Sequence, residues 1–284
     1  MLDASDRAKL VSLRASPAVT ASSLSVARRG NLGADAAITA AQSVQVALGD
    51  EQPPHRCDDA RFDPSLSVAD IDLQLLTRQL ADQGERRWSI LLSGPPGTGK
   101  SAYARHVAAA CGIEVIEKRA SDLLSMFVGG TEAAIAAAFS HAQAANALLI
   151  IDEVDSLLRD RRSATTRWEV SIVNELLGWM DVHPLPIVVT TNFDEALDIA
   201  ATRRFLFKIR FSSLDAKRAR QLFQANFGLE PSDALDRIEG LVPSDFALVN
   251  RRVQIMGKAE QKDIKSMLSQ EVQARSSPRN TIGF

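Results

Sequence analysis

One short stretch, Gly94–Ser101, constrains the fold of this chain more than any other feature. It reads Gly-Pro-Pro-Gly-Thr-Gly-Lys-Ser and fits G-x-x-x-x-G-K-[ST], in which glycines let successive backbone N–H groups face phosphate oxygens. Residues 88–93 before it read as a buried strand, and residues 101–111 after it read as a helix whose N-terminus faces the anion. This order of strand, glycine-rich turn and helix predicts a binding site for a nucleoside triphosphate.

The residues of this stretch with the most specific chemistry are the last two. Lys100 is expected to reach the β- and γ-phosphates, and the Ser101 hydroxyl is expected to ligate Mg²⁺. A glycine loop that binds nothing is the alternative, and the two flanking elements argue against it. The residues expected to contact the nucleotide are consecutive: Gly94, Pro95, Pro96, Gly97, Thr98, Gly99, Lys100, Ser101 and Ala102.

Two further apolar runs end in polar residues. Residues 148–151 lead into the acids Asp152 and Glu153, a pattern in which the first acid holds Mg²⁺ and the second polarises the attacking water. We therefore assign Asp152 to the metal, together with Ser101, and Glu153 to catalysis. A strand at 186–191 ends in Asn192, whose amide could orient water beside Glu153 or could simply form a turn. For the acids, the alternative is an ordinary solvated strand end.

Composition narrows the class of protein. The formal net charge of −2 gives no global basic field, which argues against nucleic acid as a partner. The two cysteines suit a reducing compartment, so we expect a cytoplasmic protein. Residues 133–151 contain no Asp, Glu, Lys or Arg over 19 positions, but polar residues interrupt the run. A helix followed by a buried strand explains this run better than a membrane span does.

The chain divides into three predicted parts. Residues 1–60 are rich in Ala and Ser, and we expect a helical or partly disordered segment there. Residues 61–212 show the strand and helix alternation of an α/β domain, a parallel sheet sandwiched by helices. From residue 213 the pattern becomes all-helical, which predicts a small second domain and a C-terminal tail over 213–284.

These motifs together resemble the AAA family of AAA+ ATPases over about residues 62–275. The adjacent arginines look like those of the katanin, spastin and ESCRT-disassembly branch, whose subunits offer paired arginine fingers to a neighbour. The residues that carry the resemblance are Gly94–Ser101, Phe127-Val128-Gly129, Asp152-Glu153, Asn192 and Arg203-Arg204-Phe205.

The resemblance implies a hexameric ring of identical subunits that uses ATP and Mg²⁺ and pulls a polypeptide client through its pore. By that resemblance Asn192 is sensor 1, and Arg203 and Arg204 act on ATP held by the neighbouring subunit. The residues after Ser213 are then the helical lid. The implied catalytic residues are Lys100, Glu153, Asn192, Arg203 and Arg204, and the implied pore loop is Met126, Phe127, Val128 and Gly129.

The chain departs from the AAA family pattern in two places, and in a third it differs from other AAA+ groups. The Asp-Ile-Gly-Gly of the family stands here as residues 70–73, Asp-Ile-Asp-Leu, and the resemblance implies adenine contacts by Asp70 and Ile71. Residues 243–246 contain no sensor 2 arginine, which suits the AAA subgroup. Leu206 stands where the family usually has an acid.

Two other classes of function stay open. A nucleotide-controlled assembly switch would bind ATP and turn it over slowly, although such proteins commonly lose the acid found here at Glu153. A nucleic-acid remodeller is the less favoured class because the chain lacks a basic stripe. The sequence does not identify the client.

Overall fold

The computed structural model describes residues 62–125, 127, 129–158, 167–192, 197, 199–257 and 260–276 of the 284-residue chain. The predicted N-terminal segment, residues 1–60, lies outside the described residues, as do Met126 and Val128. The elements in chain order are η1 (Pro64–Leu66), β1 (Val68–Ala69), α4 (Leu73–Gln83), β2 (Ser89–Ser93), α5 (Lys100–Ala110), β3 (Val115–Arg119), α6 (Ala120–Leu123), α7 (Gly130–Ala145), β4 (Leu148–Asp152), η2 (Val154–Ser156), α8 (Arg167–Val182), β5 (Ile187–Thr191), α9 (Ile199–Thr202), β6 (Phe207–Ser212), α10 (Ala216–Phe227), α11 (Pro243–Met256) and α12 (Gln261–Ser276).

The strands form one sheet in the order β1-β6-β2-β5-β4-β3. Strands β2 to β6 pair in parallel, and β1 pairs antiparallel with β6. The expected parallel α/β sheet is therefore confirmed. The sequence did not predict β1, because its two residues are too few to show a strand periodicity.

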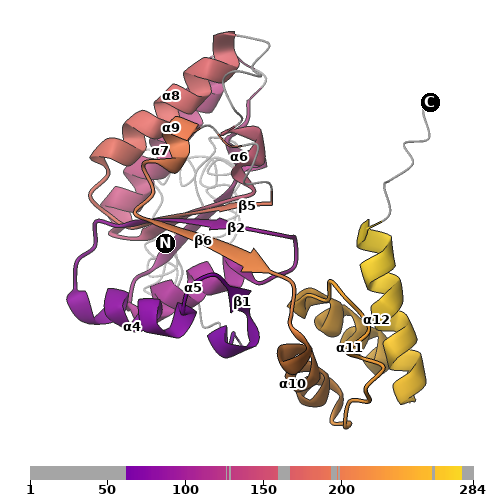
Figure 1. Ribbon diagram of the computed structural model, residues 1–284. Helices are drawn as coiled ribbons and strands as arrows, with labels where there is room; N and C mark the ends of the chain where they lie inside the picture. Colours follow the sequence, from indigo (N-terminus) through magenta and orange to yellow (C-terminus); the bar gives the residue numbers. More distant parts are fainter. Residues whose placement is uncertain are drawn as a thin grey trace, which may run out of the picture. The chain divides into compact units, whose positions relative to one another are not determined.

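Helices cover both faces of this sheet (Figure 1). The core on one face is formed with α6, α7, α8 and α9, and the core on the other with α4 and α5. Since side chains along a strand alternate between faces, β4 sends Leu149 and Ile151 to the first core and Leu148 and Ile150 to the second. Burial on both faces explains why β4 reads as an unbroken apolar run.

The helices after β6 have a core of their own. Helices α10, α11 and α12 enclose Phe223, Phe246 and Leu268, which are all fully buried. The chain enters this region directly after Ser212, and the Leu214 N–H donates to the Leu241 carbonyl at 2.7 Å. The expected α/β sheet followed by a small helical lid is confirmed. Among the described helices, none combines the length and apolarity that crossing a membrane requires.

The sheet topology brings three chain segments to one edge. In register, Ser93 of β2 lies beside Thr191 of β5, and Ile151 of β4 lies beside Val189 of β5. The carboxyl ends of β2, β4 and β5 therefore adjoin one another, as is usual for ligand sites of open parallel sheets.

Candidate nucleotide-binding site

The turn between β2 and α5 requires glycine at specific positions. Gly94, Gly97 and Gly99 have φ angles of 130°, 81° and 100°, a region that other residues rarely occupy. A Cβ on Gly94 would lie 2.1 Å from the Phe211 carbonyl oxygen, and one on Gly97 would lie 2.0 Å from Ser244 Oγ. The backbone of this turn is thus close to its neighbours and free of side chains where a phosphate would approach.

Lys100 is a buried lysine: only 7% of the residue is exposed, and hydrogen bonds hold its ammonium group at the turn. Its Nζ donates to the carbonyl oxygens of Gly94 and Pro95, at 2.7 and 2.9 Å, and to Asn192 Oδ1 at 2.8 Å. Burial lowers the pKa of Lys100 from its ordinary value, and the nearby carboxylate of Asp152 opposes that shift. All three acceptors are neutral, so anionic phosphate oxygens could replace them favourably.

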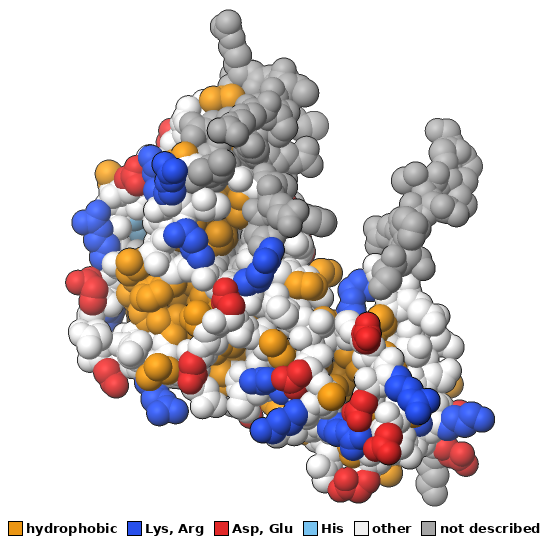
Figure 2. Space-filling view, in the orientation of Figure 1, with side chains coloured by type: hydrophobic (Ala, Val, Ile, Leu, Met, Phe, Trp, Pro, Cys, Tyr) orange, Lys and Arg blue, Asp and Glu red, His pale blue; other side chains and the backbone are white. Residues whose placement is uncertain are grey.

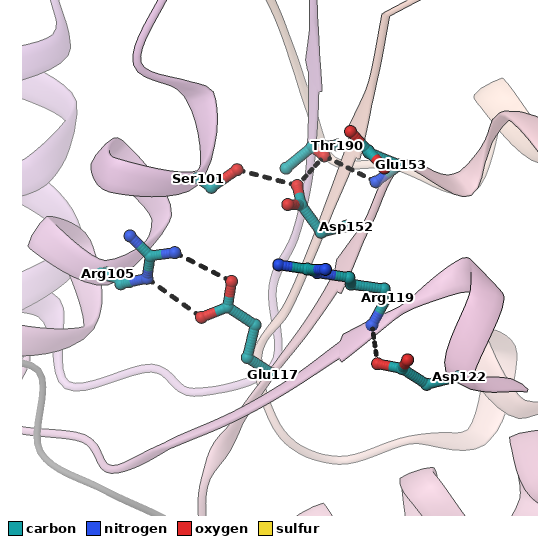
Figure 3. A network of polar contacts seen from close by, with 8 residues as sticks. All are labelled: Ser101, Arg105, Glu117, Arg119, Asp122, Asp152, Glu153 and Thr190. Carbon is teal, nitrogen blue, oxygen red and sulfur yellow. Dashed lines mark hydrogen bonds and ion pairs between the residues drawn. The ribbon is translucent and has the colours of Figure 1, made fainter. Parts of the chain in front are cut away.

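The acid predicted to hold Mg²⁺ is oriented by two hydroxyl groups (Figure 3). Ser101 Oγ donates to Asp152 Oδ1 at 2.8 Å, and Thr190 Oγ1 donates to the same oxygen. Thr190 Oγ1 also accepts from the Glu153 N–H at 3.0 Å. Ser101 and Asp152 are therefore in direct contact, which fits a divalent cation held by one carboxylate, one hydroxyl and substrate phosphates.

Glu153 has an unusual backbone conformation. Its φ is 56°, and among the described residues it shares a positive φ only with Asn146 and several glycines. The hydrogen bond from its N–H to Thr190 stabilises this conformation. Sequence reasoning missed Thr190, although a hydroxyl residue near the end of a buried strand could have indicated it.

Asp155 organises the end of the neighbouring strand. It accepts hydrogen bonds from the Thr191 hydroxyl and, at 3.2 Å, from the Asn192 N–H. Asn192 is thereby oriented with its Oδ1 toward Lys100. Asp155 was also missed, because its role depends on contact between β5 and the turn η2 that follows β4.

These groups surround one pocket of about 410 Å³. The amide of Ser244, at the start of α11, donates to the Gly97 carbonyl at 3.2 Å, so the lid contacts the turn directly. The lining residues are Phe62, Pro96, Gly97, Gly99, Lys100, Ser101, Ala102, Asp152, Glu153, Thr190, Asn192, Pro243, Ser244 and Ala247. Of the predicted residues outside this lining, Gly94 and Pro95 hold Lys100, and the Thr98 hydroxyl donates to the Pro95 carbonyl at 2.9 Å.

Asp70 and Ile71 are not among the residues that line this pocket. Asp70 Oδ1 accepts from the Arg210 N–H at 2.9 Å beside β1 and β6, and Ile71 lines a separate cleft. Asp72, which follows Ile71, is the N-cap of α4 and accepts from the Leu75 N–H at 2.9 Å. Phe62 lines the pocket instead, with its ring 3.1 Å from the position of a Cβ on Gly99.

The two arginines lie between α9 and β6, and both are exposed. Arg204 forms an ion pair with Asp181 of α8, with 2.9 Å between Nε and Oδ1. The Arg203 guanidinium has no hydrogen-bond or ion-pair partner among the described residues. The single-chain structure does not bring either arginine into the pocket lining.

Phe127 lies just before α7 and is 80% exposed, the highest value among the large apolar residues described. The Gly130 N–H donates to its carbonyl at 3.0 Å, and its own N–H donates to Ser125 Oγ at 3.2 Å. Gly129 follows with a φ of 79°. Phe127 is therefore displayed on a turn rather than packed in a core.

Comparison with known proteins agrees with this geometry. Residues 90–213 match the family described as "ATPase family associated with various cellular activities (AAA)". This region is an AAA domain. The matched region contains the glycine-rich turn, both acids, Asn192 and the two arginines. The carboxyl ends of β2, β4 and β5, which adjoin the pocket, therefore all lie within the AAA domain.

Several curated proteins are similar in sequence to this chain. Human "Peroxisomal ATPase PEX6" is 33% identical over 186 residues, 61% of this chain and 19% of the relative. "Spastin" of Drosophila grimshawi is 35% identical over 173 residues, 55% of this chain and 22% of the relative. A "Putative cell division cycle ATPase" of Plasmodium falciparum is 34% identical over 172 residues, 55% of this chain and 14% of the relative. The matches thus cover only between 14% and 22% of the length of these relatives.

Proposed function

We propose that this chain is an Mg²⁺-dependent ATPase subunit of a hexameric ring that remodels or unfolds a protein client. The observation that carries the proposal is the convergence of Lys100, Asn192, Asp152 and Glu153 on one pocket beside a glycine turn. A positive group, a metal-binding acid and a general base within one pocket are what phosphoryl transfer to water requires.

The glycine turn and Lys100 would bind the triphosphate. Backbone N–H groups of the turn and the N-terminus of α5 face anionic oxygens, and Lys100 exchanges its neutral acceptors for the β- and γ-phosphates. Ser101 and Asp152 would hold Mg²⁺, which when bound neutralises charge on the transferred phosphoryl group. Phe62 and the lid residues Pro243 and Ala247 would enclose the adenine base of ATP.

Glu153 would act as the general base. It lines the pocket, and its backbone is fixed by Thr190, the residue that also orients Asp152. The carboxylate would accept a proton from the water that attacks the γ-phosphorus, and Lys100 would stabilise the charge that develops on the leaving ADP oxygen. Asn192, joined to Lys100, would position the water and the γ-phosphate.

The client and the ring are inferred from other residues. Phe127, exposed on its turn, would contact an extended polypeptide, and Arg203 and Arg204 would act on ATP of the adjacent subunit. Acidic and basic side chains are interspersed over the face drawn in Figure 2, which favours a protein client over nucleic acid.

Two substitutions test the ATPase assignment. Glu153→Gln should keep ATP binding and lower turnover by about 10²-fold or more, since it removes the base and keeps the shape. Lys100→Ala should lose both binding and turnover. Glu239→Gln, a change of the same kind on the exposed surface of the lid, is the control. Normal turnover by Glu153→Gln would contradict the assignment, and slow turnover by the unaltered protein with every client tried would favour the assembly switch.

Mixing subunits tests the ring. Arg203→Ala has an intact pocket and Lys100→Ala has intact arginines, so a mixture should regain part of the activity that each lacks. Activity per chain should also rise with protein concentration. Activity that stays constant on dilution to a demonstrated monomer would exclude action between subunits.

A further inference from the structure

The guanidinium of Arg204 is held by its own chain. Its Nε donates to both carboxylate oxygens of Asp181, at 2.9 and 3.0 Å, and its Nη1 donates to the Ala200 carbonyl at 3.0 Å. Asp181 belongs to the last turn of α8, and Ala200 belongs to α9. One side chain therefore joins two helices of the same subunit.

The backbone around Arg204 is fixed as well. Ser89 Oγ, at the start of β2, donates to the Arg204 carbonyl at 3.0 Å and accepts from the Leu206 N–H at 3.1 Å. Phe205, between these two residues, is 2% exposed and belongs to the core that α8 covers. The turn after Arg203 is thus attached to the sheet, to the core and to α8.

Arg203 differs from Arg204 in its side chain. Both arginines are exposed, but within the described part of the chain the Arg203 guanidinium makes no hydrogen bond or ion pair. Arg203 immediately precedes the anchored residue, so its backbone position is well defined. An arginine guanidinium is always charged and presents several N–H donors suited to phosphate.

We propose that the two arginines have different roles: Arg203 contacts the γ-phosphate in the adjacent subunit, and Arg204 is a positioning residue that acts through Asp181. This proposal rests on the ring function proposed above and refines it, since that function gave both arginines the same role. The Nε and Nη1 groups of Arg204 are engaged in three hydrogen bonds within its own chain, and these bonds restrain the guanidinium beside Asp181. Arg203 would give up no hydrogen bond or ion pair with a described residue, and the rigid turn reduces the entropy lost when it binds.

A set of conservative substitutions separates the roles. Arg203→Gln and Arg203→Lys should both lower the turnover of the assembled ATPase by about 10³-fold, because a lysine does not reproduce planar contacts with phosphate. Arg204→Gln and Asp181→Asn should each lower turnover by about fivefold or less, since half-exposed ion pairs are weak. Arg204→Lys keeps a positive charge beside Asp181 and should restore near-normal turnover.

A double substitution tests whether Arg204 acts through Asp181. The protein carrying both Arg204→Gln and Asp181→Asn should be no slower than either single variant, because both changes remove the same contact. The lid supplies matched controls in Arg251→Gln and Arg252→Gln, adjacent arginines of which Arg252 pairs with Glu271 at 2.6 Å. Neither control should lower turnover measurably. Unfolding midpoints of all variants identify any that fail to fold.

The outcomes distinguish this proposal from the ring itself. A 10³-fold loss in both Arg204→Gln and Arg204→Lys, with Asp181→Asn near normal, would show that Arg204 itself contacts the phosphate and would overturn the division of roles. If turnover still rises with protein concentration in that case, the ring function stands. If turnover does not depend on concentration and Arg203→Gln is near normal, action between subunits fails, and this proposal fails with it.

Discussion

Lys100 Nζ donates to Asn192 Oδ1 at 2.8 Å, and this contact joins the phosphate-binding turn to the end of β5, 92 positions later in the chain. Asn192 is itself oriented by Asp155, which accepts its N–H at 3.2 Å. The relationship makes the position of Lys100 dependent on β5 as well as on the turn that carries it.

Removing this contact should affect turnover more than binding. We expect Asn192→Ala to lower kcat by roughly 10²-fold, as when one preorganised polar group is removed from a reacting site. The affinity for ATP should change little, because Lys100 keeps its carbonyl acceptors. Steady-state kinetics alongside nucleotide-binding titrations would check this. A fall in affinity with unchanged kcat would assign Asn192 to binding instead.

Thr190 should matter through its hydroxyl group. Thr190→Val keeps the shape and removes the group that bonds both Asp152 and the Glu153 N–H. Leaving the partly buried Glu153 N–H without an acceptor should lower the free energy of unfolding by about 1–3 kcal/mol. ATP turnover should fall as well. Denaturant unfolding and ATPase assays would measure both effects, and Thr190→Ser, which keeps a hydroxyl, should be close to normal in each.

The contact between the lid and the turn should not tolerate a side chain on Gly97. In Gly97→Ala the methyl group would meet Ser244 Oγ at 2.0 Å, and the φ of 81° is strained for alanine. We expect at least a tenfold loss of ATP affinity, about 1.4 kcal/mol. Gly178→Ala is the matched control, because that helical glycine has no atom within 4 Å of the new methyl group and the change should stabilise α8 slightly. Equal affinity in the two variants would contradict a lid that contacts the turn.

His183 should make stability depend on pH. Its side chain is almost fully buried, and neither ring nitrogen has a hydrogen-bond partner among the described residues. The ring meets Phe139 edge-on, with 5.1 Å between centroids. Burial lowers the pKa of His183 below its ordinary 6.5, so the unfolded chain binds this proton more readily than the folded chain does. This contribution to stability is therefore present above about pH 6.5 and is lost as the pH falls below it toward the folded pKa.

Unfolding midpoints at about pH 7.5 and about pH 5.5 would measure this dependence. The loss of stability between the two pH values should be smaller in His183→Leu than in the unaltered protein. His141→Leu, which changes a less buried histidine of α7, is the comparison. An unchanged pH dependence in His183→Leu would rule out His183 as its source.

Phe127 should be dispensable for folding and needed for client processing. Because the side chain is 80% exposed, Phe127→Ala should leave the unfolding midpoint and the basal ATPase activity close to normal. Remodelling of a client, followed as loss of client structure in the presence of ATP, should fall strongly. Leu124→Ala, at a less exposed apolar position nearby, is the comparison. A large drop in the midpoint for Phe127→Ala would assign Phe127 to packing.

Much of the site could be predicted because its chemistry is local in the chain. The stretch Gly94–Ser101 binds phosphate through consecutive backbone groups, so its spacing alone predicts its position in the fold. Likewise, β4 and β5 are buried on both faces, and their apolar runs show where the polar ends begin. These local patterns predicted that Ser101 and Asp152 serve one metal site, and their hydroxyl and carboxylate lie 2.8 Å apart.

Other features depended on contacts between distant segments, which no local pattern encodes. Asp70 contacts β6 through the Arg210 N–H, and Asp72 caps α4. Phe62 and Ser244 reach the pocket from segments that are far apart in the chain, before β1 and at the start of α11. The sequence alone determined which residues can carry the chemistry. Only the packing of helices against the sheet decided that Arg204 pairs with Asp181 while Arg203 has no ion pair among the described residues, since that difference arises from where α8 ends relative to α9.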